Sequence, residues 1–105
     1  MQARYKLKIT PAAASDLDAI DTYISEELHA PTAAQKLIEK FESNFNSLCD
    51  MPYRCELSRN EILKAKGYRK LLIDNYVTLY LINETLKMII IARVFYGAMD
   101  YEKYL

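Results

Sequence analysis

The chain begins with a segment in which hydrophobic and positively charged residues alternate. Within residues 4–9, every second side chain is apolar, namely Tyr5, Leu7 and Ile9, and the residues between them are basic. A period of two is typical of a strand with one face in the core and the other in solvent. The pattern therefore predicts a first strand whose outer face is basic.

The hydrophobic period then changes to that of a helix. Apolar residues recur three and four positions apart, at Leu17, Ile20, Ile24 and Leu28. Thr10 offers a hydroxyl that suits an N-cap, and Pro11 suits the first helical position. The spacing predicts an amphipathic helix over residues 11–28.

A second apolar stripe follows the break at "HAPTAAQ". Its members are Ala34, Leu37, Ile38, Phe41, Phe45 and Leu48. Two starts fit this helix: Pro31 at the first helical position, or Thr32 with Gln35 in a capping box. Because the connection is short, the two helices are expected to be antiparallel neighbours, an αα-hairpin whose apolar side needs a sheet to cover.

The second half of the chain predicts strands. After a loop that contains Pro52, "EILKAKG" predicts one or two helical turns that end at Gly67. Three strand-like runs follow, at residues 68–74, 76–83 and 87–96. The connections between them are short and turn-like, which implies an antiparallel meander.

The predicted order of elements is thus β-α-α-β-β-β. We expect an α+β fold: an antiparallel sheet, made of the three-strand C-terminal meander plus the N-terminal strand, packed on the αα-hairpin. The pattern does not fix the position of the first strand in the sheet.

Composition agrees with one globular domain over residues 1–105, since 51% of the residues are hydrophobic and 27% are charged. No apolar run has the length of a membrane span, and the first residues have no signal-peptide core. We therefore expect a cytoplasmic protein that does not enter a membrane. In that compartment Cys49 and Cys55 are expected to be packed thiols, with neither a disulfide nor a metal between them.

Charge is unevenly distributed, although the formal net charge is zero. Residues 1–50 carry 5 basic and 8 acidic side chains, and residues 51–105 carry 9 basic and 6 acidic ones. The acids of the first helix are interpreted as solvated. The cationic half suits phosphate, although composition alone favours solvated charge without a function.

Few catalytic groups are available. His29 is the one histidine, so mechanisms that need two are excluded, and Gly-rich phosphate loops, HExxH and CxxC motifs are absent from the sequence. Arginine and tyrosine remain, with Arg69 and Arg93 inside strand-like runs. An RNA strand can be cleaved by its own 2′-OH while guanidinium groups stabilise the developing charge. The alternative is structural, because tyrosine favours strands and arginine often covers sheet surface.

Three stretches carry a resemblance to a known family. They are "ITPAAASDLDAIDTYISEEL" with "PTAAQKLIEKF", then "GYRKLLIDNYVTLYLI", then "IIIARVFYGAMDYEKYL". In this order they resemble the RelE/ParE superfamily of toxins from bacterial type II toxin–antitoxin modules. The similarity covers nearly the whole chain.

The resemblance implies a partner and a site. It implies a cognate antitoxin that neutralises the toxin, a homodimer or a heterotetramer with that antitoxin, and no cofactor. By position, the candidate catalytic residues are Arg69, Arg93, Tyr96 and Tyr101, and the candidate RNA-binding residues are Lys64, Lys66 and Lys70. The sequence departs from the family at Ala98 and Met99, where many relatives are basic.

Three functions remain open. The first is a RelE-like, metal-independent endoribonuclease that cuts mRNA on the ribosome. The second is a ParE-like inhibitor of DNA gyrase without nuclease activity, in which Arg93 and Tyr96 support the C-terminal segment. The third is an inactive α+β relative. The nuclease requires Arg69 and Arg93 to share one accessible patch that the helices leave free.

Overall fold

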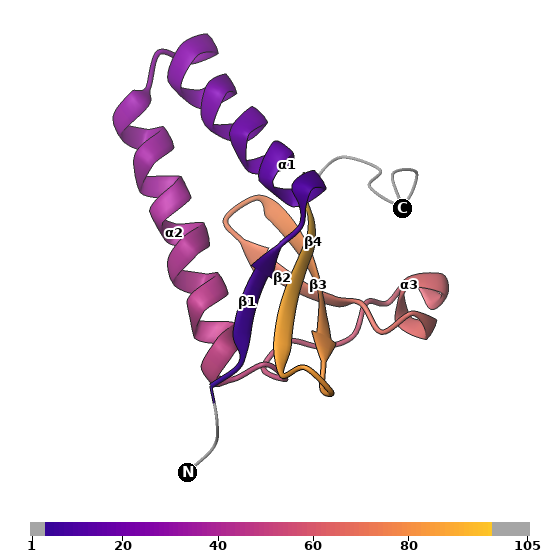
Figure 1. Ribbon diagram of the computed structural model, residues 1–105. Helices are drawn as coiled ribbons and strands as arrows, with labels where there is room; N and C mark the ends of the chain where they lie inside the picture. The colour runs from indigo at the N-terminus through magenta and orange to yellow at the C-terminus, as the bar shows by residue number, and fades with distance from the viewer. Residues whose placement is uncertain (1–3, 98–105) are drawn as a thin grey trace.

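The computed structural model describes residues 4–97. They form one mixed β-sheet with a helical hairpin packed on it (Figure 1). The first half contains β1 (Lys6–Ile9), α1 (Pro11–Thr22), the π-helix η1 (Tyr23–Glu27) and α2 (Pro31–Asp50). The second half contains α3 (Glu61–Ala65), β2 (Arg69–Ile73), β3 (Tyr76–Asn83) and β4 (Met88–Tyr96). The predicted α+β class and element order are confirmed.

The sheet has the strand order β1-β4-β3-β2. Strands β2, β3 and β4 form the predicted antiparallel meander. The expectation of a wholly antiparallel sheet is wrong, because β1 pairs with β4 in parallel, with Ile9 opposite Ile91. The two helices return the chain to the end of the sheet where β1 begins, and Tyr5 N–H donates to the Cys49 carbonyl there. Three alternating strands started from that end leave β4 running in the same direction as β1.

The helix starts follow from their capping residues. Thr10 is the N-cap of α1, and its hydroxyl accepts from the Ala13 N–H at 3.1 Å. Residues 11–28 do not form one regular α-helix, since the last turns widen into η1. Pro31 takes the first position of α2, after Ala30, so the alternative capping box is not used.

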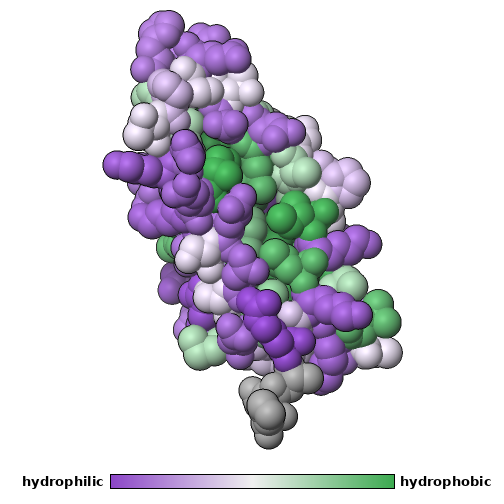
Figure 2. All heavy atoms as spheres, turned by 60° about the vertical axis from the view of Figure 1, so that its left-hand side comes forward, coloured by the Kyte–Doolittle hydropathy of each residue, from purple (hydrophilic) through white to green (hydrophobic). Residues whose placement is uncertain are grey.

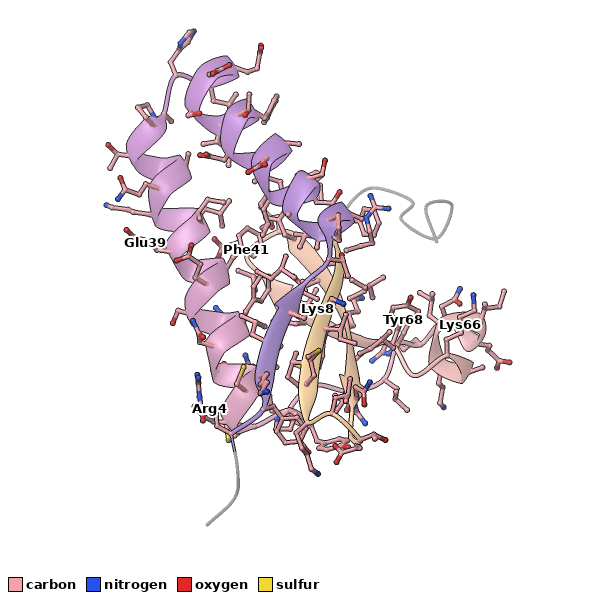
Figure 3. All side chains as sticks on the ribbon, in the orientation of Figure 1. Arg4, Lys8, Glu39, Phe41, Lys66 and Tyr68 are labelled. Carbon is pink, nitrogen blue, oxygen red and sulfur yellow. The ribbon has the colours of Figure 1, made fainter. Side chains whose placement is uncertain are left out.

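Helices α1 and α2 cover one face of the sheet. Figure 3 shows Phe41 pointing from α2 toward the strands, whereas Glu39 points away from them. Phe41 belongs to the main core between the hairpin and the sheet, together with Ala13, Phe45, Leu48, Tyr80 and Ile91. Figure 2 shows the distal end of the hairpin covered by hydrophilic side chains, with hydrophobic side chains gathered below it.

A smaller core lies on the opposite face of the sheet. Leu63 of α3 packs there with Val77, Leu79 and Phe95. The segment α3 ends as predicted at Gly67, whose φ of +88° is a left-handed conformation that glycine adopts without strain. The loop before α3 is thereby brought beside β2.

Cys49 is a buried free thiol and Cys55 a half-buried one. Within residues 4–97, no helix combines the length and the apolar character that crossing a membrane requires.

Candidate functional site

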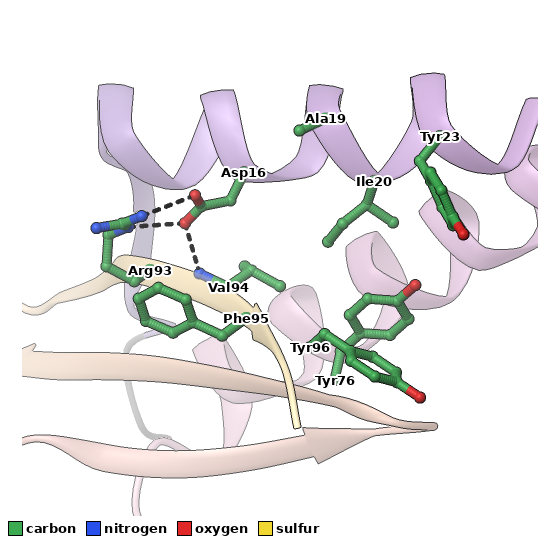
Figure 4. A pocket seen from close by; sticks show the side chains of 9 residues that line it. All are labelled: Asp16, Ala19, Ile20, Tyr23, Tyr76, Arg93, Val94, Phe95 and Tyr96. Atoms are coloured by element: carbon green, nitrogen blue, oxygen red, sulfur yellow. Dashed lines mark hydrogen bonds and ion pairs between the residues drawn. The ribbon is translucent and has the colours of Figure 1, made fainter. Parts of the chain in front are cut away.

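The end of β4 holds the most constrained charged pair in residues 4–97. Arg93 Nε donates to Asp16 Oδ2 at 2.8 Å, and Arg93 Nη2 donates to Asp16 Oδ1 at 3.0 Å (Figure 4). The carboxylate also accepts the backbone N–H of Val94 at 2.9 Å. Both side chains are largely covered, with exposed fractions of 22% for Arg93 and 16% for Asp16. A bidentate contact of this kind fixes orientation as well as charge.

The pair forms here because β1 stops short of the end of β4. β1 pairs with β4 only up to Ile91. Beyond that point Thr10 takes over the edge: its N–H donates to the Ile91 carbonyl and its hydroxyl to the Ala92 carbonyl. Asp16 continues the same edge at Val94. The first turns of α1 therefore replace the missing strand partner of β4.

A register shift between Leu79 and Tyr80 accompanies this change. Leu79 lies opposite Arg93 and Tyr80 opposite Ile91, so Ala92 is an extra residue in β4. Such a bulge bends a strand and redirects its side chains. Arg93 lies over the Phe95 ring at 4.6 Å from the centroid, on the α3 side of the sheet, and reaches around the strand edge to Asp16.

A groove of about 320 Å³ adjoins the pair, between α1 with η1 and the end of β4. Its walls are mainly apolar or aromatic, and include Ala19, Ile20, Tyr23, Tyr76 and Tyr96 (Figure 4). Asp16 and Arg93 close one end of it. Exposed apolar surface of this kind is typical of sites that bind an apolar ligand or a segment of another protein.

The last residues of β4 are held by two more contacts. The Tyr96 ring meets the Tyr76 ring edge-on, with centroids 5.7 Å apart. Gly97 N–H donates to the Asn75 carbonyl at 2.7 Å, and a Cβ at Gly97 would lie 2.9 Å from that oxygen. Burial raises the pKa of Tyr76. The end of β4 is thus held by contacts on both sides.

Arg69 lies elsewhere. Its neighbours at alternate positions, Leu71 and Ile73, belong to the core under the helices, whereas Phe95, two residues from Arg93, belongs to the opposite core. Because side chains alternate along a strand, Arg69 and Arg93 lie on opposite faces of the sheet. The expected shared patch of the two guanidinium groups is therefore not formed.

Arg69 instead fastens the loop before α3. Its Nη1 donates to the Cys55 carbonyl at 2.6 Å, and its guanidinium lies 4.8 Å from the centroid of the Tyr53 ring. Tyr80 holds the same loop, because its buried hydroxyl donates to the Pro52 carbonyl at 2.9 Å. Burial is the main cause of the raised pKa of Tyr80. Arg69 is thus engaged as a tether of residues 52–55.

The other candidate residues are dispersed. Lys64 and Lys66 are exposed on and just after α3, and Lys70 is half-buried on β2 (Figure 3 labels Lys66). Tyr96 lines the same groove as Arg93 but lies beside Tyr76, away from the end that Arg93 and Asp16 close (Figure 4). Tyr101, like Ala98 and Met99, lies outside the described residues. Of the predicted set, the structure brings together Arg93 and Tyr96.

Two participants were missed by the sequence interpretation. Asp16 was taken as solvated, yet it is four residues before Ile20 and three after the buried Ala13, on the inward side of α1. Glu84 is the second. It accepts from Tyr5 at 2.7 Å, from Tyr53, and from Lys87 at 2.8 Å.

Hydrogen bonds from Lys87, Tyr53 and Tyr5 lower the pKa of Glu84 to about 2. The same carboxylate raises the pKa of both tyrosines. This cluster joins the β3–β4 turn to β1 and to the loop that Arg69 tethers. Within residues 4–97, no group of three or more His, Cys, Asp or Glu side chains is placed to hold a metal ion.

The chain is similar to known proteins in sequence and in fold. Residues 7–101 match the family model described as "ParE toxin of type II toxin-antitoxin system, parDE". The toxin–antitoxin complex RelBE2 from Mycobacterium tuberculosis contains a similar chain: TM-score 0.63, 22% identity, covering 90% of this chain and 99% of that one.

A chromosomal ParDE toxin–antitoxin system from P. aeruginosa contains another similar chain. It has a TM-score of 0.69 and 24% identity, and the match covers 87% of this chain and 94% of that one. No curated protein sequence matches the chain. At these identities the two solved structures establish the shared fold.

Proposed function

We propose that this chain, a member of the ParE toxin family of type II toxin–antitoxin systems, arrests growth by binding DNA gyrase and not by cutting RNA. In this proposal the contacts come from the end of β4, the adjoining groove and the segment that follows Gly97. A cognate antitoxin, as in the complexes that contain the two structural relatives, neutralises it.

The Asp16–Arg93 pair carries the proposal. A guanidinium that stabilises a phosphate must turn its N–H groups toward that phosphate. In Arg93, Nε and Nη2 donate to Asp16, so one edge of the guanidinium is already occupied by a carboxylate. Releasing them would leave a largely covered carboxylate without its cation, which is costly. Arg93 therefore acts as an anchor of β4.

The position of Arg69 supports the same function. It lies on the other face of the sheet from Arg93, bound to the Cys55 carbonyl and the Tyr53 ring. A nuclease of the expected kind needs both guanidinium groups at one phosphate. An inhibitor that works by contact needs only a firmly held binding surface.

One observation favours the endoribonuclease as a second candidate. Lys64 and Lys66 are exposed, and neither they nor Lys70 has an ion-pair partner among the described residues. Cations of this kind suit an RNA backbone. Docking alone, however, supplies no group to cleave the strand.

Two assays on one preparation separate these functions. The purified toxin is added to DNA gyrase with relaxed plasmid, and to a cell-free translation reaction whose mRNA is then examined on a gel. We expect supercoiling to be blocked and the mRNA to stay whole. Cleaved mRNA with normal supercoiling would overturn the proposal in favour of the nuclease. The control in both assays is toxin bound to its antitoxin.

A further inference from the structure

The groove between α1, η1 and the end of β4 has two ends of different chemistry (Figure 4). Asp16 and Arg93 close one end. At the other end lie the rings of three tyrosines from three elements: Tyr23 of η1, Tyr76 of β3 and Tyr96 of β4. We call these three residues the tyrosine end of the groove. Side chains that are remote in the sequence thus form one aromatic wall.

Two of these rings are open to a ligand, and the third is held in place. Tyr76 packs edge-on between Phe41 and Tyr96, with ring centroids 5.7 Å away on each side. Tyr96 is 50% exposed and Tyr23 is 55% exposed. The face of an aromatic ring carries partial negative charge and attracts cations. The tyrosine end therefore offers accessible ring faces on a fixed support.

An acidic rim borders the same end. Residues 11–28 contain five acidic side chains and no basic one. Glu26 and Glu27 lie three and four residues after Tyr23, within about one turn of it, and both are exposed. Neither belongs to an ion pair within residues 4–97. Their charges are thus available to a positively charged group that enters the groove.

Two cations near the groove are already matched by carboxylates. Arg93 is paired with Asp16, and Lys40 is paired with Asp74. Burial, followed by the other two phenol groups of the tyrosine end and by Asp74, raises the pKa of Tyr76. The surroundings of Tyr76 therefore disfavour an added negative charge. The balance of charge at the tyrosine end favours a cationic ligand over an anionic one.

The walls between the two ends are apolar. Ala19, Ile20 and Val94 line this part of the groove, whose volume is about 320 Å³. This volume is at the small end of the range for ligand pockets, so it suits one long side chain. Arginine and lysine place their apolar stems along apolar surface and keep the charged head at a polar or aromatic site. The groove has both parts of such a site.

We propose that the tyrosine end of the groove binds the guanidinium of an arginine side chain that the target protein presents. The guanidinium stacks on the rings of Tyr23 and Tyr96, and its stem lies on Ile20. Its charge faces Glu26 and Glu27. Arginine suits this end better than lysine, because its planar head stacks on aromatic rings and is more weakly hydrated. The inference rests on the proposed function, which assigns this groove to the target.

The first test titrates two short peptides into the complete toxin with ring-labelled tyrosines and follows the ring signals by NMR. One peptide is Leu-Arg-Leu with blocked ends. In the other, citrulline replaces arginine and keeps its shape and most of its N–H donors without the charge. We expect saturable shifts of Tyr23, Tyr76 and Tyr96, with binding about tenfold weaker for the citrulline peptide. Equal affinities, or shifts confined to other tyrosines, would overturn the inference.

Variants of Tyr23 separate the aromatic face from apolar contact. Tyr23→Leu keeps an apolar side chain but removes the ring, and should weaken binding of the arginine peptide about fivefold while sparing the citrulline peptide. Tyr23→Phe keeps the ring and should bind both peptides as the wild type does. Because Tyr23 is 55% exposed, neither change disturbs the core. Equal losses for both peptides in Tyr23→Leu would contradict a cation site.

The acidic rim is tested by the paired change Glu26→Gln with Glu27→Gln. It should weaken binding of the arginine peptide about threefold at low salt. The matched control is Glu39→Gln with Glu42→Gln, which removes the same charge from the exposed side of α2. Equal weakening by the two pairs would mean that net charge alone attracts the peptide, and would overturn the placement of the cation at this rim.

The supercoiling assay distinguishes failure of this inference from failure of the proposed function. A wild-type toxin that leaves gyrase active refutes the gyrase target, whereas the peptide titrations still decide whether the groove binds a guanidinium. If the wild type blocks supercoiling, Tyr23→Leu should be less potent than Tyr23→Phe. Equal potency of these two variants would leave the gyrase target in place and overturn the inference.

Discussion

Asp16 and Arg93 are 77 residues apart in the sequence, yet they share two hydrogen bonds, at 2.8 and 3.0 Å, where α1 crosses the end of β4. The same carboxylate accepts the Val94 N–H. One acidic side chain therefore caps a strand edge and orients a guanidinium. This relationship is the basis of our proposal that Arg93 supports the groove and the end of β4.

Replacing Arg69 by Ala should lower stability and leave growth arrest in place. The variant loses the hydrogen bond to the Cys55 carbonyl and the contact with Tyr53, a loss of about 1–2 kcal/mol in the free energy of unfolding. Chemical denaturation measures that loss, and induction of the variant in cells without antitoxin measures arrest. A nuclease that depends on Arg69 would show the reverse, a stable protein that no longer arrests growth.

Tyr96 should matter through its ring and not through its hydroxyl. The ring packs edge-on against Tyr76 at the wall of the groove. Tyr96→Phe keeps this contact and should inhibit gyrase as the wild type does, whereas Tyr96→Ala should lose potency. Dose–response curves in the supercoiling assay make the comparison. A proton-transfer role would instead appear as an inactive Tyr96→Phe variant.

Gly97→Ala should destabilise the end of β4. The added Cβ would lie 2.9 Å from the Asn75 carbonyl oxygen, which also accepts the Gly97 N–H, so the backbone must shift. Overpacking of this kind costs about 1–3 kcal/mol. Thermal unfolding should show a lower melting temperature than that of the wild type. In the Gly97→Ala protein, the Tyr96 variants should then change potency in the supercoiling assay by less than they do in the wild type. An unchanged melting temperature would mean that this close approach does not constrain the chain.

Glu84 should make the free energy of unfolding decrease as the pH falls into the acid range. Its folded pKa of about 2 lies below the ordinary value of 4.5, so its contribution is present above pH 4.5 and is lost as the pH falls toward 2. Denaturation of the wild type and of Glu84→Gln across this window should show a flatter pH dependence for the variant. Identical slopes would mean that the carboxylate has no net preference for the folded state. Glu42→Gln, at an exposed site on α2, is the matched control.

The sequence predicted the fold in most respects because its patterns are local. Alternation at residues 4–9 and the stripes of α1 and α2 identified their elements, and Thr10 and Gly67 identified ends. The parallel pairing of β1 with β4 was not predicted, since strand direction depends on how the whole chain returns to the sheet. No periodicity in one segment contains that information.

The candidate site was predicted only in part for a similar reason. Arg93 and Tyr96 were identified by position, and they do line one groove. The face of Arg69 relative to Arg93 depends on the extra residue Ala92 in β4 and on the pairing register. The partner of Arg93 comes from a helix far away in the sequence. Asp16 was interpreted as solvated, although its spacing from Ala13 and Ile20 puts it on the inward side of that helix, and only the structure shows that it contacts Arg93.

The most direct test of this account compares growth arrest by Asp16→Asn, Arg93→Gln and the double variant at equal expression. Asp18→Asn, an exposed acid two residues away, is the control. If Arg93 works as an anchor through Asp16, the two single variants lose arrest to a similar extent and the double variant is no worse than either. If Asp16→Asn arrests growth like the wild type while Arg93→Gln does not, the guanidinium acts on its own and the account is contradicted.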